Sequence, residues 1–185
     1  MRLNLGTLES PMGPLLLVTD DNNRLRALDF ASHQAHLNRT LREHYGNFEL
    51  LQTAVPKDIA TALDGYFDGD YLALNGISIV TAGSDLQRQV WAALRDIPAG
   101  HTTSYGELAR ALGYDDPRMA IEIGAANGAN PIAIVVPCHR VIAKNGDLKG
   151  YAWGLHRKRW LLEHERALPQ VQQAEVQQTL RLPGF

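Results

Sequence analysis

The sequence predicts an α/β N-terminal domain followed by a mainly α-helical C-terminal domain. The first 30 residues contain three short apolar runs separated by turn-forming residues, which is typical of a β-meander. Beyond Thr81-Ala82-Gly83 the apolar spacing becomes helical, and capping-box sequences follow. We therefore expect an N-terminal domain at residues 1–82, a C-terminal domain at residues 83–168 and a tail at residues 169–185.

The N-terminal domain is expected to combine strands with two helices. Turn chemistry at Ser10–Pro14 and at Asp20–Asn23 separates the first three strands. Pro56 suits the first turn of a helix, because proline has no N–H group to donate there. His33 and His36 are interpreted as surface residues, since no cysteine or acidic pattern accompanies them as metal ligands. The expected elements are strands Leu3–Leu8, Leu15–Thr19 and Leu25–Phe30, helices His33–Tyr45 and Pro56–Phe67, and strand Leu72–Val80.

Three helices are expected early in the C-terminal domain. Ser84 and Ser104 each begin a capping box, and the second helix should end at Gly113. Asp116-Pro117 starts the third helix, which runs to about Gly128. Short helices joined by a glycine-containing turn predict a helix-turn-helix, although such pairs also occur in proteins that do not bind DNA. The first helix carries the apolar residues Leu86, Val90, Trp91 and Leu94.

The remaining segments lead to and from the chain's single cysteine. The apolar run Ile132–Val136 predicts a strand that ends just before Cys138. A strand at Val141–Ala143 and a hairpin turn at Asn145-Gly146 are expected next. An amphipathic helix at Leu155–Arg166 follows, and no function is assigned to the glutamine-rich tail.

The composition is that of an ordinary soluble protein, with 45% hydrophobic and 21% charged residues. A net charge of −2 argues against a strongly basic nucleic-acid-binding protein, yet a local basic cluster can still bind phosphate. The N-terminus lacks a secretory signal and no apolar run reaches membrane-spanning length, so we expect a cytoplasmic protein without a membrane partner. The basic cluster comprises Arg140, Lys144, Lys149, Arg157, Lys158 and Arg159.

Cys138 is the most informative residue. A lone cysteine cannot form an intrachain disulfide, and it supplies only one of the ligands that structural zinc needs. It is therefore either a buried core residue or a nucleophile. His139 directly after it and the apolar run before it favour the nucleophile, but free cysteine is also among the most buried residue types, so both interpretations stay open.

The segments around Cys138 resemble the O6-alkylguanine-DNA alkyltransferase family. Pro137-Cys138-His139-Arg140-Val141 carries the resemblance, which extends from about residue 84 to 166 and more loosely to Ser10–Leu15. It implies a ribonuclease-H-like α/β N-terminal domain and a C-terminal domain with a winged helix-turn-helix. The other matching segments are Asn130-Pro131, Gly150-Tyr151, Ser104–Ala109, Gly124–Gly128 and Lys158–Glu165.

The resemblance implies a DNA repair reaction that each molecule performs once. An alkyl group would pass from O6 of guanine to Cys138, which yields S-alkylcysteine and restored guanine without a cofactor or metal. The implied partner is double-stranded DNA containing O6-alkylguanine. The protein is expected to be a monomer, and cooperative assembly on DNA is left open. Because the target atom lies inside the duplex, its nucleotide must be flipped out.

The family pattern also implies roles for individual residues. His139 would be the base, acting through a bridging water because neighbouring residues on an extended segment point apart. Glu165 would orient and stabilise His139, and Asn130 would hydrogen-bond the active-site turn. The residues expected to contact the base or the DNA are Tyr105, Arg118, Ile121, Val141, Tyr151, Ala152, Trp153 and Lys158.

Two positions depart from the family pattern. Ile121 stands where an arginine usually fills the gap left by the flipped base, and Glu122 stands where a small residue is usual. We expect weaker duplex binding and slower flipping, although Arg118 could compensate in part or form an intrahelical pair with Glu122. Trp153 occupies a position that is glycine in many members, so it should narrow the pocket unless its ring packs outward.

Two alternatives to a single-use alkyltransferase are considered. The first is a lesion-binding or regulatory alkyltransferase-like protein, against which Cys138 argues because such relatives lack the nucleophile. The second is a hydrolase that uses Cys138 and His139, but the sequence reveals neither an oxyanion hole nor a turnover step.

Overall fold

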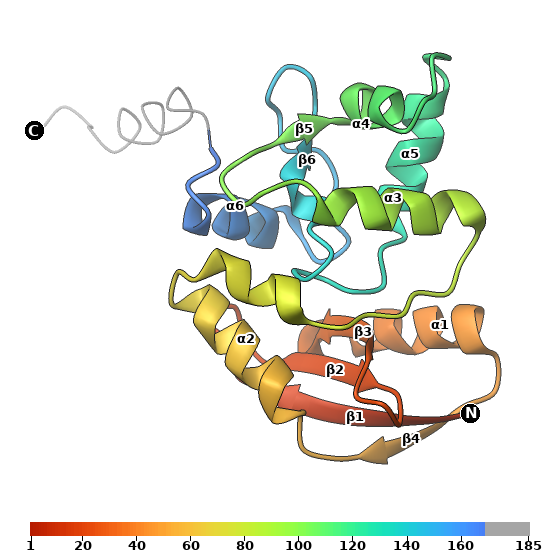
Figure 1. Ribbon diagram of the computed structural model, residues 1–185, viewed down its shortest axis with the longest axis vertical. Coiled ribbons are helices and arrows are strands. Elements are labelled where there is room, and N and C mark those ends of the chain that lie inside the picture. Colours follow the sequence, from red (N-terminus) through yellow and green to blue (C-terminus); the bar gives the residue numbers. More distant parts are fainter. Residues whose placement is uncertain (169–185) are drawn as a thin grey trace, which may run out of the picture.

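The computed structural model describes residues 1–168, and the N-terminal β-meander is confirmed (Figure 1). Strand β1 (Arg2–Leu8) pairs antiparallel with β2 (Leu15–Thr19), which pairs antiparallel with β3 (Leu25–Phe30). Strand β4 (Glu49–Gln52), which was not predicted, lies parallel to β1 and completes the order β3-β2-β1-β4. Its side chains are mostly exposed, so it lacks the apolar alternation that identifies a half-buried strand.

Helices cover both faces of this sheet. Alternate strand residues point to opposite faces, so Leu16 packs on one side and Leu17 on the other. Helix α1 (Gln34–Tyr45) covers the first face, and the short 3-10 helix η1 (Ala31–His33) precedes it. Helix α2 (Lys57–Phe67) packs on the second face, together with the C-terminal domain. Pro56 is the residue immediately before α2.

The expected strand Leu72–Val80 is wrong. The chain instead forms the 3-10 helix η2 (Tyr71–Gly76), and only Ile79 makes an isolated bridge, to Leu25. Leu74 and Ile77 are buried three residues apart, which is the period of a 3-10 helix. The spacing of the apolar residues Leu74 and Ile77 therefore fits a helical turn rather than a strand.

The C-terminal domain is mainly helical, as expected. It contains α3 (Asp85–Arg95), α4 (Tyr105–Ala111), α5 (Met119–Gly128) and α6 (Leu155–His164). Ser84 and Ser104 both form the predicted capping boxes. Helix α5 begins two residues later than expected, because the Asp116 carboxylate accepts the Arg118 N–H in a turn before the helix.

Two further expectations around the cysteine are wrong. Ile132–Val136 is not a strand, since Ile134 has φ of 69° and only Ile132 bridges a strand residue, Leu28. The run is apolar because it is buried between the domains. Asn145-Gly146 makes a turn, but no hairpin, because β6 (Val141–Ile142) pairs in parallel with the distant strand β5 (Thr103–Ser104).

A shared apolar core joins the two domains. One cluster of buried residues runs from Phe30 and Tyr66 through Trp91 to Trp153. Backbone bonds add to it, because Leu28 N–H donates to Pro131 O and Ala133 N–H donates to Leu28 O. The edge of β3 that pairs with no other strand of the sheet therefore holds the segment that leads to the cysteine. Within residues 1–168, no helix is long and apolar enough to span a bilayer. The tail at 169–185 lies outside the described residues.

Candidate active site around Cys138

Cys138 is the first residue of the 3-10 helix η3 (Cys138–Arg140), and a polar brace holds the turn before it. Asn130 Nδ2 donates to Val136 O at 2.8 Å, and Asn130 Oδ1 accepts the Ile132 N–H at 2.9 Å. This arrangement matches the role expected of Asn130. Burial raises the pKa of the Cys138 thiol to about 11, and the Asn130 amide and the charge of Lys158 only partly offset the effect. The sulfur is therefore a neutral thiol at rest.

His139 and Glu165 form a buried pair behind the cysteine. His139 Nε2 lies 2.9 Å from Glu165 Oε1, and neither side chain is exposed. Glu165 follows directly after α6. Arg140 also binds this carboxylate, with Nε 2.9 Å from Oε2 and Nη2 2.9 Å from Oε1. Tyr66 O–H, from α2 in the other domain, donates to Oε1 at 2.7 Å.

The network determines which group carries the charge. Burial lowers the pKa of His139, and Glu165 only partly opposes this shift. Burial alone would raise the pKa of Glu165, but His139 and Arg140 outweigh it and hold that pKa well below its usual range. At neutral pH we therefore assign the charges to Glu165 and Arg140 and treat His139 as neutral. Its Nε2–H donates to Glu165, which leaves a lone pair on Nδ1.

That lone pair has no hydrogen-bond partner within the described residues, although Nδ1 is buried. No hydrogen bond joins the Cys138 sulfur to His139 in this part of the chain, as expected. The reason differs from the one predicted, because the two residues lie in a 3-10 turn rather than on an extended segment. A thiol proton can reach Nδ1 only after a small movement or through a bridging water.

A cavity of about 350 Å³ lies in front of Cys138. This volume is in the range of small-molecule pockets. Tyr105 comes from the start of α4, and its hydroxyl donates to Lys149 O at 3.3 Å. Val141 is buried in β6, next to η3. The lining residues are Tyr105, Gly124, Asn127, Gly128, Cys138, Gly150, Tyr151, Ala152 and Trp153.

Trp153 packs inward. Its side chain is 1% exposed, and its Nε1–H donates to Asp29 Oδ1 at 2.7 Å. The ring of Tyr151 lies edge-on to it with centroids 5.0 Å apart. The expected narrowing of the cavity by this indole therefore agrees with the position of the ring, and the outward-packed alternative does not.

Lys158 does not reach the surface, so the expectation that it contacts DNA is wrong for this arrangement. Its side chain is fully buried, and Nζ donates to Val141 O at 2.6 Å and to Lys149 O and Gly150 O at 3.2 Å each. Burial lowers its pKa to about 8, which leaves most of the ammonium protonated at pH 7. Lys158 thus ties the backbone at Val141 to the backbone at Lys149 and Gly150, where the cavity-lining segment 150–153 begins.

The basic cluster expected from the sequence is divided by the fold. Arg140 is buried against Glu165, and Lys158 is buried among backbone carbonyls. Neither side chain therefore presents its charge to solvent. Lys144, Lys149 and Arg159 remain exposed. The surface charge available for phosphate is therefore smaller than the sequence alone indicates.

The exposed side of α5 carries the departures from the family pattern. Ile121 is 74% exposed, and Glu122 next to it is also exposed. Arg118 binds Asp116 through Nη2 at 2.7 Å and makes no ion pair with Glu122 in the described part of the chain. The alternative of an intrahelical pair between Arg118 and Glu122 is therefore wrong.

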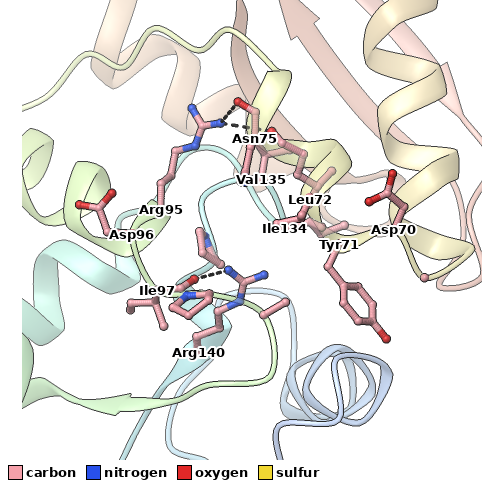
Figure 2. Close-up of a pocket in the computed structure, with 15 residues that line it drawn as sticks. Asp70, Tyr71, Leu72, Asn75, Arg95, Asp96, Ile97, Ile134, Val135 and Arg140 are labelled. Carbon is pink, nitrogen blue, oxygen red and sulfur yellow. Dashed lines mark hydrogen bonds between the residues drawn. The ribbon is translucent and has the colours of Figure 1, made fainter.

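A second cavity of about 440 Å³ lies between the domains (Figure 2). Arg140 enters it and donates to Ile97 O, and Arg95 Nη2 donates to Leu74 O at 3.2 Å. Cys138 and His139 do not line it. Cys138 therefore faces only the smaller of these two cavities, and the larger one lies at the junction between the domains beside Arg140.

Some residues that support the site were not identified from the sequence. Tyr66 binds Glu165 across 99 positions of sequence, and Asp29 binds Trp153 across 124. No local pattern could reveal these contacts, since each pair meets only when the domains pack together.

Comparison with known proteins agrees with this two-part organisation. A family model described as 6-O-methylguanine DNA methyltransferase, ribonuclease-like domain, matches residues 3–79. A second model, described as the DNA binding domain of the same methyltransferase, matches residues 85–167.

Individual relatives agree with these family matches. The methylated-DNA–protein-cysteine methyltransferase of Salmonella typhimurium is 44% identical over 167 residues, covering 89% of this chain and 96% of that protein. The Mycobacterium bovis protein of the same name is 40% identical over 166 residues, covering 87% and 91%. The crystal structure of Mycobacterium tuberculosis OGT in complex with DNA matches with a TM-score of 0.71 and 36% identity, covering 91% of this chain and 96% of that one.

Proposed function

Because this chain belongs to the 6-O-methylguanine DNA methyltransferase family, we propose that Cys138 is the cysteine that accepts the alkyl group. The chain is a methylated-DNA–protein-cysteine methyltransferase, and it repairs DNA by transferring an alkyl group to its own cysteine. It has the ribonuclease-like and DNA-binding domains of the family. The observation that carries the assignment is that the single cysteine faces a cavity while the next residue, His139, is bound to the buried Glu165.

The reaction begins with removal of the thiol proton. The raised pKa of Cys138 means that the sulfur is not ionised at neutral pH, so a base is required. The neutral His139 takes up the proton on Nδ1 through one bridging water. Glu165 then stabilises the imidazolium through the 2.9 Å contact at Nε2.

The alkyl carbon moves in a single displacement. The sulfur lone pair forms the new S–C bond as the bond between that carbon and O6 of guanine breaks. The electron pair of the broken bond passes to the base, which takes up one proton and becomes guanine. The thioether that results is stable, and the cavity-lining residues include no second thiol that could accept the alkyl group from it. Each molecule therefore acts once.

The cavity is suited to a flipped base. Tyr105 and Tyr151 provide aromatic surfaces on its walls. The Tyr151 hydroxyl and Asn127 Oδ1 are buried without hydrogen-bond partners within the described residues, so they can bind polar groups of a base. Flipping a nucleotide out of the stack costs a few kcal/mol, which contacts of this kind would have to offset.

The DNA-binding surface is proposed to be a winged helix-turn-helix. Helices α4 and α5 form the helix pair, and the loop after β6 forms the wing. Exposed Ile121 on α5 would wedge between base steps, as apolar residues do in other DNA-bending proteins. It cannot hydrogen-bond the unpaired base opposite, and Glu122 beside it repels phosphate. We therefore expect slower repair of duplex DNA than an arginine would allow.

The substrate is double-stranded DNA with O6-alkylguanine, bound by a monomer. Cooperative assembly along DNA would appear as binding that steepens with protein concentration. A reduced thiol is needed for attack, which fits the cytoplasm.

Intact-protein and peptide mass spectrometry test the proposal. Incubation with an O6-methylguanine oligonucleotide should add one methyl group to Cys138, and the Cys138→Ser protein should gain none. A protein that binds the lesion without any mass change would instead be a lesion-binding regulator. An adduct that forms only with a carbonyl substrate and then disappears would indicate a hydrolase.

A further inference from the structure

The N-terminal domain binds the indole N–H of Trp153, although this residue lines the cavity of the other domain. The indole Nε1–H donates to Asp29 Oδ1 at 2.7 Å. The Trp153 carbonyl accepts a hydrogen bond from Arg157 Nη1 at 3.1 Å. The residue is therefore held at both its ring and its backbone.

Asp29 is built as a rigid acceptor. It lies in β3 and is 2% exposed, and Oδ1 also accepts the Phe30 N–H at 2.7 Å. Its second oxygen, Oδ2, lies 2.6 Å from His36 Nδ1 on α1. A buried carboxylate without such partners would be costly, so these contacts fix its orientation. The neighbouring Leu28 joins the two domains through its backbone.

Arg157 connects the same loop to the N-terminal domain by a second route. Its Nη2 donates to Ser32 Oγ at 3.0 Å, and its guanidinium lies 4.0 Å from the centre of the Phe30 ring. Both contacts are with residues of the N-terminal domain. A planar guanidinium bound on several sides holds its partners in one geometry. The Trp153 carbonyl is thereby tied to that domain as well.

The indole ring is enclosed by aromatic residues of both domains. Its centroid lies 5.7 Å from that of His36 and 6.4 Å from that of Phe30 in the N-terminal domain, and 5.0 Å from that of Tyr151 in the C-terminal domain. The ring cannot turn away from the cavity without breaking the bond to Asp29. A larger alkyl group therefore meets a fixed wall instead of a movable one.

We infer that Asp29 and Arg157 are positioning residues that hold Trp153 against the cavity, so that the N-terminal domain sets the size of alkyl group accepted at Cys138. This inference rests on the proposed alkyl transfer to Cys138. A methyl group fits in front of the wall, whereas a benzyl group requires the indole to move. Releasing the indole should therefore favour the benzyl group selectively.

The test is the ratio of Cys138 alkylation rates with single-stranded oligonucleotides carrying O6-benzylguanine or O6-methylguanine. Asp29→Leu removes the acceptor, and Arg157→Met removes the second anchor. Each should raise the benzyl-to-methyl ratio by roughly fivefold, the factor expected from the loss of one hydrogen bond. Asp29→Asn is the matched control, because its amide oxygen can still accept the indole N–H. Its ratio should stay within about twofold of the unaltered protein.

The outcomes separate this inference from the proposed function. An unchanged ratio in Asp29→Leu and Arg157→Met, each folded at the assay temperature, overturns the inference. If Asp29→Leu does not fold, Arg157→Met decides alone. Trp153→Gly gives the upper limit of the ratio, and no increase there would show that Trp153 is not the wall. Failure of the unaltered protein to alkylate Cys138 with either lesion would overturn the proposed function itself.

Discussion

Replacing Glu165 by glutamine should damage both stability and alkyl transfer. The carboxylate is buried and accepts hydrogen bonds from His139, Arg140 and Tyr66. Glutamine keeps the shape but removes the charge, which leaves the Arg140 guanidinium buried without its counter-ion. Breaking a buried ion pair in this way costs about 3–5 kcal/mol. For a chain of this size, that loss lowers the unfolding midpoint by roughly 10 °C.

Transfer should slow as well, because glutamine cannot stabilise a His139 imidazolium. We expect a decrease of about 10²–10³ in the single-turnover rate, within the range that a positioned base contributes. The matched control is Glu163→Gln, two residues earlier and exposed on α6, which should change the free energy of unfolding by less than about 0.5 kcal/mol.

Acid unfolding tests the contribution of Glu165 to stability without reference to alkyl transfer. The pKa of Glu165 is lower in the folded protein than in the unfolded chain, so its contribution to stability is present above about pH 4.5 and is lost as the pH falls through the folded value. Glu165→Gln should lack this loss. The measurements are thermal unfolding between pH 3 and 8 and quenched-time methyl transfer at pH 7.5. A variant as stable and as fast as Glu163→Gln would refute the reasoning.

The other predictions concern three further residues. Because burial lowers the pKa of His139 below its usual value, the transfer rate should stay flat between about pH 7 and 9 and should decline only at lower pH, where the ring gains its proton. A rate that already falls between about pH 9 and 7 would contradict a neutral base. Ile121→Arg should speed repair of duplex oligonucleotides but not of single-stranded ones in stopped-time assays, whereas Leu72→Arg, an equally exposed apolar position at 75%, should speed neither. Lys158→Met should lower the unfolding midpoint by several degrees, because three backbone carbonyls lose their hydrogen-bond donor. Lys144→Met at the surface should leave the midpoint unchanged, and equal midpoints for the two variants would argue against a structural role for buried Lys158.

Features with local causes were predicted correctly. The capping boxes at Ser84 and Ser104 depend only on residues three positions apart, and the β-meander depends on nearby turns. The strands expected at Leu72–Val80 and Ile132–Val136 failed for one shared reason. Their apolar residues are buried by contacts between the domains, and burial of that kind occurs without strand pairing.

The candidate site was predicted in part. Cys138 and His139 are adjacent, so the sequence alone showed a thiol next to an imidazole, and the role of His139 as the base came from the family resemblance. Glu165 entered only through family resemblance, and the structure brings it to 2.9 Å from His139. Tyr66 and Asp29 left no sequence signal, because they act from a different domain.

The amino-acid sequence by itself singled out Cys138, because it is the only cysteine of the chain and the family motif surrounds it. Only the tertiary structure decided which buried groups the cations Arg140 and Lys158 bind. Arg140 and Lys158 look alike in sequence to surface cations, yet one neutralises Glu165 and the other binds three carbonyls in the interior. The physical reason is that a buried carboxylate or carbonyl needs a partner, and which cation supplies it depends on how distant segments pack.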